Sequence, residues 1–449
     1  MSRLPFLAVS MLSAASALAQ VEWRHEMLQS GLPILVQGAG SPNPMVSSRG
    51  ESVYTGAFTP GMTRVFVNGV DYSSQLHPER PARHFGITDD GRPIWLCYFA
   101  TYRDLYVGTA SMGASNGYDV VDYLVPQRGL GDRFTYLGTK DGRTVAVVSG
   151  DDLTTPVLGP TGIASFVGAP TAGGLVAWVG RGPSTDGYWD GFVDGANLTK
   201  PLLGDARGGS GHRYDNGRTV VVGKGSLTRG RTHVFLDGVD VTAHSLGSGA
   251  EAIAREINLH GQVLWLGSEG AGKSSVMLDE RNVSKPIVGY VQVDGLHVSD
   301  SGDVLWSAAV EAMHKLYLND RDLTTAAMGG TDAQFGGITG LNASGHAAWT
   351  GFAPSIGGSQ WVFYDDFNLS RDALGSGLVS TGALAIGDGG HVLWWHLRPD
   401  PVYEWSYDIW LSTPVPEPSA IVVPLGLAAL SFLKRRGKAS GCAGCLRAA

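Results

Sequence analysis

Two segments of this 449-residue chain match the sequence patterns of known chemical sites. Gly267 to Ser274 fits the phosphate-binding pattern G-x-x-x-x-G-K-[ST], which works only where a strand precedes the loop and a helix follows it. Gly113 to Gly117 fits the nucleophile pattern G-x-S-x-G, which needs an apolar strand before it and a helix after it. Residues 275–279 instead predict a strand, and residues 109–118 are a polar Gly/Ser segment. We therefore assign no nucleotide and no catalytic residue to these segments.

Metal ligands are also not indicated by the sequence. The 12 histidines show no metal-binding spacing, and H-E-x-x-H does not occur. The acidic pairs Asp89-Asp90, Asp151-Asp152 and Asp365-Asp366 fall at expected turns, where solvated carboxylates are a simpler interpretation than weak Ca²⁺ ligands. Cys97 is expected to be a buried residue of a strand, and Cys442 with Cys445 cannot alone close a zinc site. We predict no metal and no cofactor.

Charge and composition narrow the classes of partner. Lys and Arg number 33 against 41 Asp and Glu, and a net charge of −8 argues against nucleic acid, which needs a basic face. A hydrophobic content of 43% with 9% aromatic residues is enough for a large core. The sequence therefore predicts a folded, acidic protein.

A glycine followed four residues later by tryptophan recurs along the chain. Tyr54 follows Gly50, Ala146 follows Gly142 and Val221 follows Gly217 in the same way. Successive glycines from Gly174 onward are 43, 44, 41, 43 and 45 residues apart, whereas the earlier intervals are 41, 51 and 32. We expect the tryptophans to fill the space between neighbouring sheets; the alternative is a set of sugar-stacking platforms on an open face. The six tryptophans are Trp95, Trp178, Trp265, Trp306, Trp349 and Trp394.

A second motif, Asp/Asn-x-Ser/Thr, recurs between these glycines. It is typical of a turn in which the first side chain caps its own backbone. In two repeats the preceding apolar run ends in Asn68-Gly69 or Asp237-Gly238, which is a strong hairpin signal. The motif begins at Asp71, Asp152, Asn197, Asp240, Asn282, Asp322 and Asn368.

These repeats predict an all-β fold. Four strands in roughly 43 residues is the size of one propeller blade, so we expect a β-propeller of eight blades over residues 20–413. Seven or nine blades, a β-helix or a pair of sandwiches are the alternatives. The last repeat stops near residues 407–411, two strands short, and Leu32 to Val36 could complete it. The third repeat looks stunted and could merge with the second.

Both chain ends look like targeting segments. An apolar stretch after Arg3 closes on Ala17 and Ala19 before Gln20, which predicts a signal peptide over residues 1–19. Near the other end, Val415-Pro416-Glu417-Pro418-Ser419 precedes an uncharged run, 420–433, and then Lys434-Arg435-Arg436. An apolar span followed by basic residues is typical of a membrane segment with a cytoplasmic tail. We define a sorting segment over residues 414–436 and a tail over 437–449.

The C-terminal segment resembles the PEP-CTERM sorting signal of exopolysaccharide-producing Gram-negative bacteria, with Pro416-Glu417-Pro418 as the shared motif. The resemblance implies Sec-type export, recognition of the motif by an exosortase-type membrane protease, and release or transfer to the cell surface. Two features depart from the family pattern. The apolar span is shorter than the ~20 residues of a membrane helix and contains Pro424, and the chain continues well past the basic cluster.

Two classes of function remain open. The first is a non-catalytic surface or matrix protein that binds extracellular polysaccharide or another protein through variable loops. The second is an extracellular propeller enzyme, a polysaccharide hydrolase or lyase, whose acid and base would come from several repeats. The irregular residues 91–173 are where we would search for such a pair.

Overall fold

The computed structural model describes residues 22–415, apart from residues 33, 36–43, 60–61, 89, 121–126, 130–133, 169, 172, 206, 271–272, 285–295, 311–312, 331, 355–358, 377–379 and 402–403. The predicted signal peptide and everything after Val415 thus lie outside the described residues. The chain divides into two compact units, of which His25–Ser412 is the larger. The smaller unit, Met1–Arg24 with Thr413–Ala449, is described only at residues 22–24 and 413–415. Among all the residues that the structure describes, no helix is long and apolar enough to cross a membrane.

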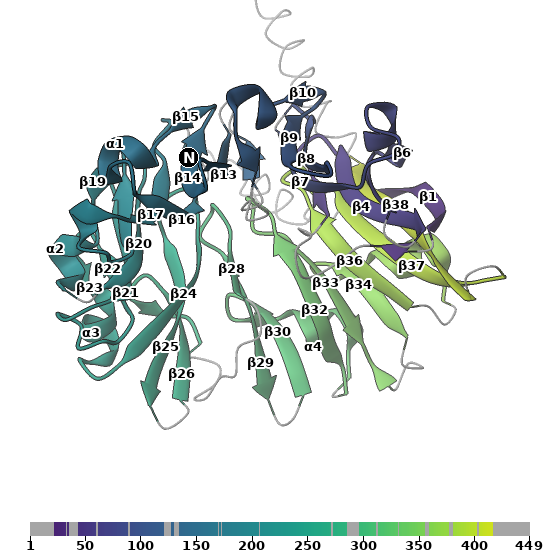
Figure 1. Cartoon of the computed structure of the whole chain (residues 1–449). Helices are drawn as coiled ribbons and strands as arrows, with labels where there is room; N and C mark the ends of the chain where they lie inside the picture. The colour runs from purple at the N-terminus through teal and green to yellow at the C-terminus, as the bar shows by residue number, and fades with distance from the viewer. Residues whose placement is uncertain are drawn as a thin grey trace, which may run out of the picture. The chain divides into compact units, whose positions relative to one another are not determined.

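The larger unit is all-β, as predicted, and consists of four-stranded sets that follow one another along the chain (Figure 1). We number these sets repeat 1 to repeat 9. Repeats 1 to 3 contain β2 (Ile34–Leu35), β3 (Met45–Val46), β4 (Ser52–Thr59), β5 (Met62–Val67) and β6 (Val70–Asp71); β7 (Ala82–Thr88), β8 (Pro93–Tyr98), β9 (Arg103–Val107) and β10 (Ala110–Ser111); and β11 (Asp119–Val120), β13 (Thr135–Lys140), β14 (Arg143–Val148) and β15 (Asp151–Asp152).

The later repeats have the same plan. Repeats 4 to 6 contain β16 (Ile163–Val167), β17 (Ala177–Arg181), β18 (Asp190–Val193) and β19 (Ala196–Asn197); β20 (Gly208–Arg213), β21 (Thr219–Lys224), β22 (His233–Leu236) and β23 (Val239–Asp240); and β24 (Glu251–Ile257), β25 (Val263–Gly270), β26 (Lys273–Leu278) and β27 (Arg281–Asn282). Repeats 7 to 9 contain β28 (Leu296–Val298), β29 (Val304–Val310), β30 (Met313–Leu318) and β31 (Arg321–Asp322); β32 (Gln334–Leu341), β33 (Ala347–Phe352), β34 (Gln360–Tyr364) and β35 (Phe367–Asn368); and β36 (Ser380–Ile386), β37 (Val392–Asp400), β38 (Glu404–Val415) and β1 (Glu22–Leu32).

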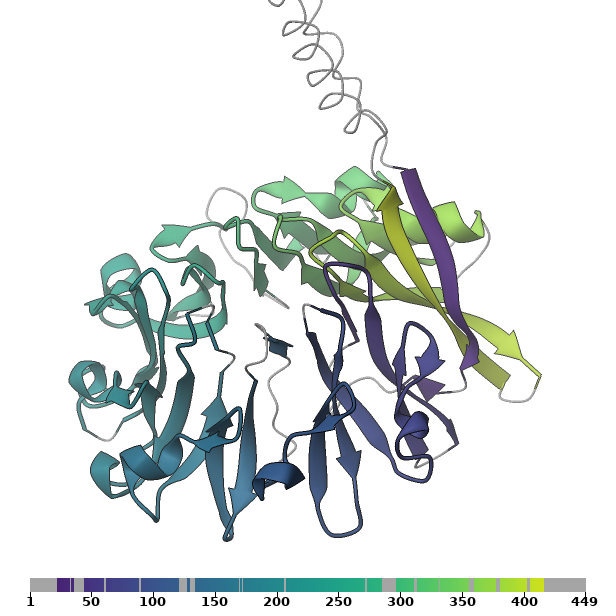
Figure 2. The ribbon, with the colours of Figure 1, turned by 90° about the horizontal axis from the view of Figure 1, so that it is seen from above.

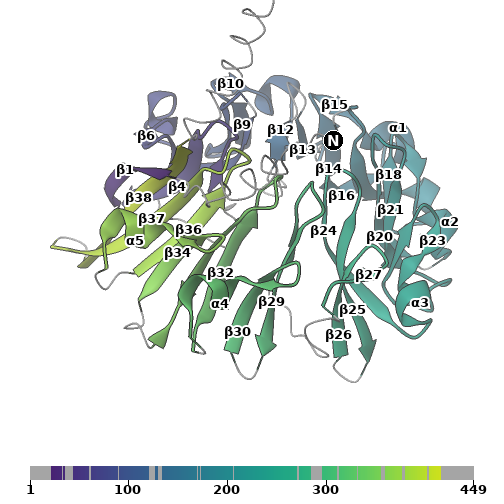
Figure 3. The ribbon, with the colours of Figure 1, turned by 180° about the vertical axis from the view of Figure 1, so that it is seen from behind.

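A short helix follows the last strand of most repeats. Figures 1 and 3 show α1, α2 and α3 along one margin of the larger unit, next to short strands such as β23. The helices are η1 (Ser73–Gln75), η2 (Ala114–Asn116), α1 (Thr154–Leu158), α2 (Lys200–Leu203), α3 (Val241–Leu246), α4 (Leu323–Met328) and α5 (Leu369–Leu374), while η3 (Pro183–Thr185) lies between β17 and β18.

The strand that completes the last repeat differs from the prediction. Repeats 8 and 9 share one eight-stranded sheet, joined at a single parallel pair, Gln360 with Ser380. The described residues therefore form eight sheets, or nine repeats when this sheet is counted as two; we expected eight blades, with nine as an alternative. β1, beside β38 in Figure 2, completes repeat 9. The predicted strand, Leu32 to Val36, does not play that part, because Ile34 and Leu35 pair with β4 of repeat 1.

Repeat 3 is a complete set, and the expectation that it is stunted was wrong. Gly142 lies in the tight turn between the second and third strands, where Lys140 pairs with Arg143. The residue of repeat 3 at the tryptophan position is Tyr136, not Ala146. The Ser149 N–H donates to the carbonyl of Phe134, two residues before Tyr136. In the same way, the Asp279 N–H donates to the carbonyl of Val263, two residues before Trp265. The position four residues before Tyr136 is 132, and the intervals from 91 to 132 and from 132 to 174 are 41 and 42. The extra strand β12 (Gln127–Gly129) pairs with β7 of repeat 2.

The repeated tryptophans form the core, as predicted. All six have at most 1% of their surface exposed. Each lies on the second strand of its repeat, and most stack on an aromatic ring of the third strand, as Trp306 does on Tyr317 with ring centroids 4.5 Å apart. The indole N–H of Trp306 donates to the carbonyl of Asn319 in the following turn at 2.7 Å. The rings are therefore unavailable as sugar platforms.

Successive repeats pack against one another. Core clusters combine residues of neighbouring repeats, and one cluster joins Leu32, Tyr54 and Phe66 to Leu393 and Ile409, so repeat 9 packs on repeat 1. Hydrogen bonds between the first turns of neighbouring repeats add to this packing. The Leu259 N–H donates to Asp300 at 3.1 Å, and the Ala343 N–H donates to Asp388 at 2.9 Å. This chain-order packing is compatible with a propeller-like arrangement.

Candidate functional site

The residues of the Asp/Asn-x-Ser/Thr motif stabilise the fold. The acidic or amide side chain caps the short helix, as Asp322 does by accepting from the Thr325 N–H at 2.9 Å. The buried hydroxyl two residues later accepts from the third strand, as Thr324 does from the Leu316 N–H at 2.8 Å. The same hydroxyl bond occurs at Ser73, Thr154, Thr199, Thr242, Ser284 and Ser370. This motif is therefore a structural device that serves as a turn, as predicted.

One register position holds a polar side chain that differs between repeats. It lies near the start of the third strand, nine residues before the repeated hydroxyl, or before Gly113 in repeat 2, which has no such hydroxyl. Asp104, Asp190, His233 and Lys315 occupy it and are all at least nine-tenths buried. His233 contacts Asp240 at 2.7 Å, and Lys315 donates to Thr325 at 3.2 Å. These side chains anchor the segment after the last strand of their own repeats.

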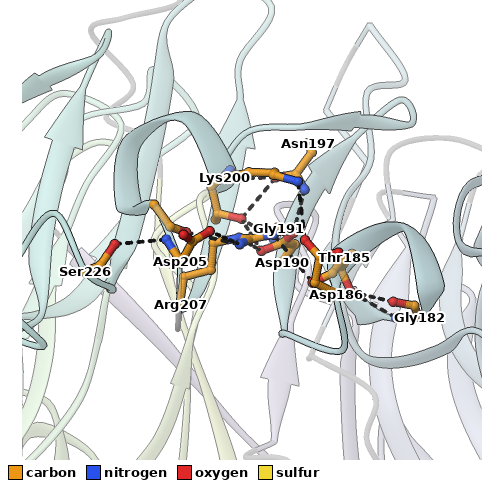
Figure 4. A network of polar contacts seen from close by, with 12 residues as sticks. Gly182, Thr185, Asp186, Asp190, Gly191, Asn197, Lys200, Asp205, Arg207 and Ser226 are labelled. Atoms are coloured by element: carbon orange, nitrogen blue, oxygen red, sulfur yellow. Dashed lines mark hydrogen bonds and ion pairs between the residues drawn. The ribbon is translucent and has the colours of Figure 1, made fainter.

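Repeat 4 has the most developed of these contacts, shown in Figure 4. Asp190 accepts two hydrogen bonds from Arg207, from Nε at 2.6 Å and from Nη2 at 2.8 Å, and both side chains are fully buried. Asn197 and Thr199 donate to the same carboxylate at 2.6 and 3.1 Å. The hydrogen bonds to Asp190 raise the pKa of Arg207 above its usual value. Because Arg207 precedes β20 of repeat 5, this bidentate ion pair joins two repeats.

One aromatic ring lies next to this ion pair, and the next residue along the chain carries a ring that packs on a second arginine. The Arg207 guanidinium carbon lies 5.3 Å from the ring centroid of Tyr188, and that of Arg181 lies 4.8 Å from the ring of Trp189. Tyr188 and Trp189 are half-buried, and Arg181 is exposed. We call Arg181, Tyr188, Trp189 and Arg207 the aromatic–arginine loop. A guanidinium over an aromatic ring makes a favourable cation–π contact. The N–H groups of the exposed Arg181 suit carboxylate or hydroxyl acceptors.

The corresponding loops of two other repeats also carry exposed rings. In repeat 2, Phe99 and Tyr102 stack with centroids 4.6 Å apart, Tyr102 is 40% exposed, and the Arg80 guanidinium lies over Phe99. In repeat 9, Trp405 is 48% exposed in the hairpin between β37 and β38. These rings are on variable loops rather than at the strictly repeated positions.

A Ser-His-Asp constellation connects β1 to repeats 8 and 9. His25 Nδ1 lies 2.7 Å from Ser412 Oγ, and His25 Nε2 lies 3.0 Å from Asp372 Oδ2. The arrangement resembles a catalytic triad, but Ser412 is fully buried and its Oγ also accepts from the Trp394 indole at 2.8 Å. A substrate cannot reach this oxygen. The contacts therefore hold β1 in place.

A groove of about 1070 Å³ lies among turns of repeats 5, 6 and 7. Acidic side chains outnumber basic ones in its lining: Asp237, Asp279, Glu280, Asp303 and Asp320. Several are already engaged, since Arg218 contacts Asp279 at 3.1 Å and Asn319 donates to Asp303 at 2.8 Å. The described residues contain no group of three or more His, Cys, Asp or Glu placed to hold a metal ion.

The candidate motifs of the sequence lie where hairpins and turns were expected. Residues 267–270 belong to β25 and residues 273–274 to its antiparallel partner β26, so a strand rather than a helix follows the P-loop pattern and it lacks the context of a phosphate cradle. Ser115 of the G-x-S-x-G pattern lies in the exposed 3₁₀ turn η2 and donates to the Ser111 carbonyl. Asp152 caps α1, and Asp366 contacts Arg321 at 2.5 Å. Asp89 lies outside the described residues.

Cys97 is buried in β8, as expected, and burial together with the Asp104 carboxylate raises the pKa of its thiol to about 11. Val415 is the last residue of β38. The rest of the sorting motif (Pro416, Glu417, Pro418, Ser419), the basic cluster (Lys434, Arg435, Arg436) and the signal cleavage residues (Ala17, Ala19, Gln20) lie outside the described residues. Sequence reasoning missed the Asp190–Arg207 pair; the polar position nine residues before the repeated Ser/Thr could have indicated Asp190.

The comparisons with family models and curated proteins give no match, whereas those with solved structures do. Among solved structures, a protein of unknown function from Dyadobacter fermentans is similar at 10% sequence identity, with a TM-score of 0.21, over 88% of this chain and 99% of that chain.

Proposed function

We propose that this chain is an exported, surface-sorted binding or matrix protein of a Gram-negative bacterium, and that its nine repeats close into a β-propeller of nine blades. The packing of repeat 9 on repeat 1 supports closure. The proposed targets of the body are extracellular polysaccharides. The proposed route is Sec-type export, membrane retention by residues 420–433, and removal of the tail by an exosortase-type protease.

The aromatic–arginine loop carries the binding proposal. The Asp190 carboxylate binds the Arg207 guanidinium, and the Tyr188 ring lies next to the same guanidinium. These contacts fix the loop before a ligand arrives, which lowers the entropic cost of binding. An aromatic ring offers its face to the C–H groups of a sugar, and Arg181 can bind a uronic carboxylate. Acidic polysaccharide is therefore the ligand class that best fits this loop.

The binding interpretation is preferred to the enzyme alternative because the buried acid in residues 91–173 is already committed. Asp104 accepts from the backbone N–H groups of Gly113 and Ala114 at 3.1 and 2.8 Å, and from the Ser111 hydroxyl at 2.7 Å. A carboxylate that satisfies three donors of the fold has little capacity left for proton transfer.

Affinity electrophoresis of the surface-recovered protein in gels that contain uronate-rich or neutral polysaccharide tests the binding proposal. Trp189→Ala and Arg181→Ala should each weaken retention roughly tenfold, since a ring or cation contact contributes about 1 kcal/mol or more. Arg213→Ala, which removes another exposed arginine, is the matched control and should leave retention unchanged. Equal retention of all variants by the uronate-rich gel would place the ligand elsewhere.

The intact mass of the same material tests the sorting proposal. A chain that begins near Gln20 and ends near Pro416-Glu417-Pro418 is the expected product. A chain that still carries Leu433 and Cys445 would contradict removal of the tail.

A further inference from the structure

The first strand of the larger unit is held by two separate groups of side chains. At one end, His25 bridges Ser412 of β38 and Asp372 of α5 at 2.7 and 3.0 Å. At the other end, Asp408 of β38 accepts from the Ser30 hydroxyl at 2.9 Å and from the Gly31 N–H at 3.0 Å. We call these contacts the two latches of β1.

The residue numbers of the two latches show how β1 runs relative to β38. Residue numbers rise along β1 from 25 to 30 while their partners fall along β38 from 412 to 408, so the strands are antiparallel. The beginning of β1 therefore lies beside the end of β38, as Figure 2 also shows. Only Gln20 and Val21 separate the predicted signal cleavage site from β1, and no residue separates β38 from Pro416. The described residues nearest in sequence to the two proposed processing sites, Glu22 and Val415, are thus at the same end of one strand pair.

β1 also protects a long edge. β38 spans Glu404–Val415, and β1 is its neighbour on the side away from β37. Without β1, this strand would present unpaired N–H and C=O groups directly before the sorting motif, and such an edge pairs with other chains. Leu32 at the end of β1 is fully buried in the cluster that joins repeats 9 and 1. Seating of β1 therefore completes repeat 9 and fixes the point at which the sorting segment begins.

We propose that seating of the N-terminal strand on β38 is required for efficient removal of the C-terminal sorting segment, so that the surface which meets the processing protease is the shared end of β1 and β38. This inference rests on the proposed sorting function. The partner is the membrane-embedded protease that the resemblance implies. A seated β1 covers the edge of β38 directly before the sorting motif, whereas an unseated β1 leaves that edge free to pair with another copy.

Latch variants of the full-length protein, expressed in a host that processes the wild-type tail, provide the test. Asp408→Ala removes the acceptor for Ser30, Gly31 and Arg398, and His25→Ala removes both contacts of the other latch. Each should populate the open form of β1 roughly tenfold more, and the double variant still more. The fraction of tail-cleaved chain, measured by intact mass after a short chase, should fall in the same order.

His233→Ala is the matched control. It breaks a His-Asp contact of 2.7 Å in repeat 5, against 3.0 Å for His25 and Asp372, and repeat 5 contains neither β1 nor β38. Hydrogen exchange supplies the second readout: the latch variants should lose protection in β1 and β38 while repeats 5 to 7 keep it. Ser30→Ala, which removes one contact of the second latch, should give an intermediate loss if the other variants fold poorly.

The outcomes separate the two proposals. Wild-type protein that keeps its tail contradicts the sorting function itself. Wild-type protein that is cleaved while the open latch variants are cleaved at the same rate overturns the coupling and leaves the sorting function in place. Equal loss of cleavage in His233→Ala would attribute the effect to general destabilisation and would also overturn the coupling.

Discussion

Replacing Asp190 with alanine should destabilise the protein more than any change of an exposed charge. Asp190 and Arg207 have no exposed side-chain surface and share two hydrogen bonds of 2.6 and 2.8 Å. Removing one partner of a buried pair costs about 3–5 kcal/mol, because the other charge stays buried without compensation. Asn197 and Thr199 lose an acceptor as well, which adds about 1 kcal/mol for each.

The total, about 5–7 kcal/mol, is comparable with the whole stability of many domains. Asp190→Asn, which keeps the shape and part of the hydrogen bonding, should cost about half as much. Asp186→Ala is the control, because its contact with Lys200 is 3.5 Å long and both side chains are more than half exposed. That exposed pair should contribute less than about 1 kcal/mol.

Urea unfolding followed by tryptophan fluorescence measures these differences, and hydrogen exchange at Gly191 and Gly211 localises them. A double-mutant cycle of Asp190→Asn and Arg207→Met should show a coupling of more than about 2 kcal/mol. The reasoning fails if Asp190→Ala costs no more than Asp186→Ala, or if the two positions are additive.

Three further predictions follow from burial and from shifted pKa values. Trp306→Ala should cost about 3–5 kcal/mol in urea unfolding, whereas Trp405→Ala, at a ring 48% exposed, should cost under about 1 kcal/mol; equal costs would contradict the core position of the repeated tryptophans. Burial lowers the pKa of His212 to about 4 from its usual 6.5, so the neutral ring stabilises the folded state above pH 6.5 and this contribution is lost as the pH falls toward 4. His212→Gln should make the free energy of unfolding less dependent on pH between 6.5 and 4. The change should be a fraction of the ~3 kcal/mol that such a pKa shift could carry, because the ring is only half-buried. An unchanged pH dependence would refute the assignment. Cys97, with its pKa raised to about 11, should react with a maleimide at pH 7.5 only after unfolding. Rapid labelling of Cys97 in the native protein, read from the mass of its peptide so that Cys442 and Cys445 are distinguished, would contradict its burial.

Much of the fold was readable from residues with a fixed spacing. The glycine four residues before each tryptophan marks a turn, and the tryptophan itself is buried on the second strand, as expected. The Asp/Asn-x-Ser/Thr motif correctly predicted a turn, although its hydroxyl bonds to a neighbouring strand rather than only to its own segment. These features are local, so that one short stretch of sequence determines each.

The errors arose where the determining contact is not local. Gly142 satisfied the glycine rule but lies in the turn between the second and third strands of repeat 3, because Tyr136 replaces the tryptophan and the sequence has no glycine four residues before it. The strand that completes repeat 9 is β1, which lies more than 370 residues from its partner Asp408. From the sequence, residues 32–36 were favoured because they are apolar, whereas β1 is mostly polar or charged and its pairing with β38 depends on contacts that are distant in sequence.

The candidate site was missed for the same reason. Asp190 and Arg207 belong to different repeats, and the equivalent position holds His233 or Lys315 elsewhere. A search for a repeated motif detects residues that several repeats share and overlooks a residue pair that occurs in one place. The rings of Tyr188 and Trp189 are recognised as part of a candidate site only from the structure, which places Arg207 and Arg181 over them.

The antiparallel pairing of β1 with β38 also determines how the protein bears load. Tension between the two ends acts on strands whose free ends lie side by side, so the hydrogen bonds between them open one after another, as in a zipper. Strands pulled from opposite ends would instead share the load across all their bonds at once. A copy held at its C-terminus and pulled at its N-terminus should thus yield at low force by shedding β1, while the other repeats stay folded.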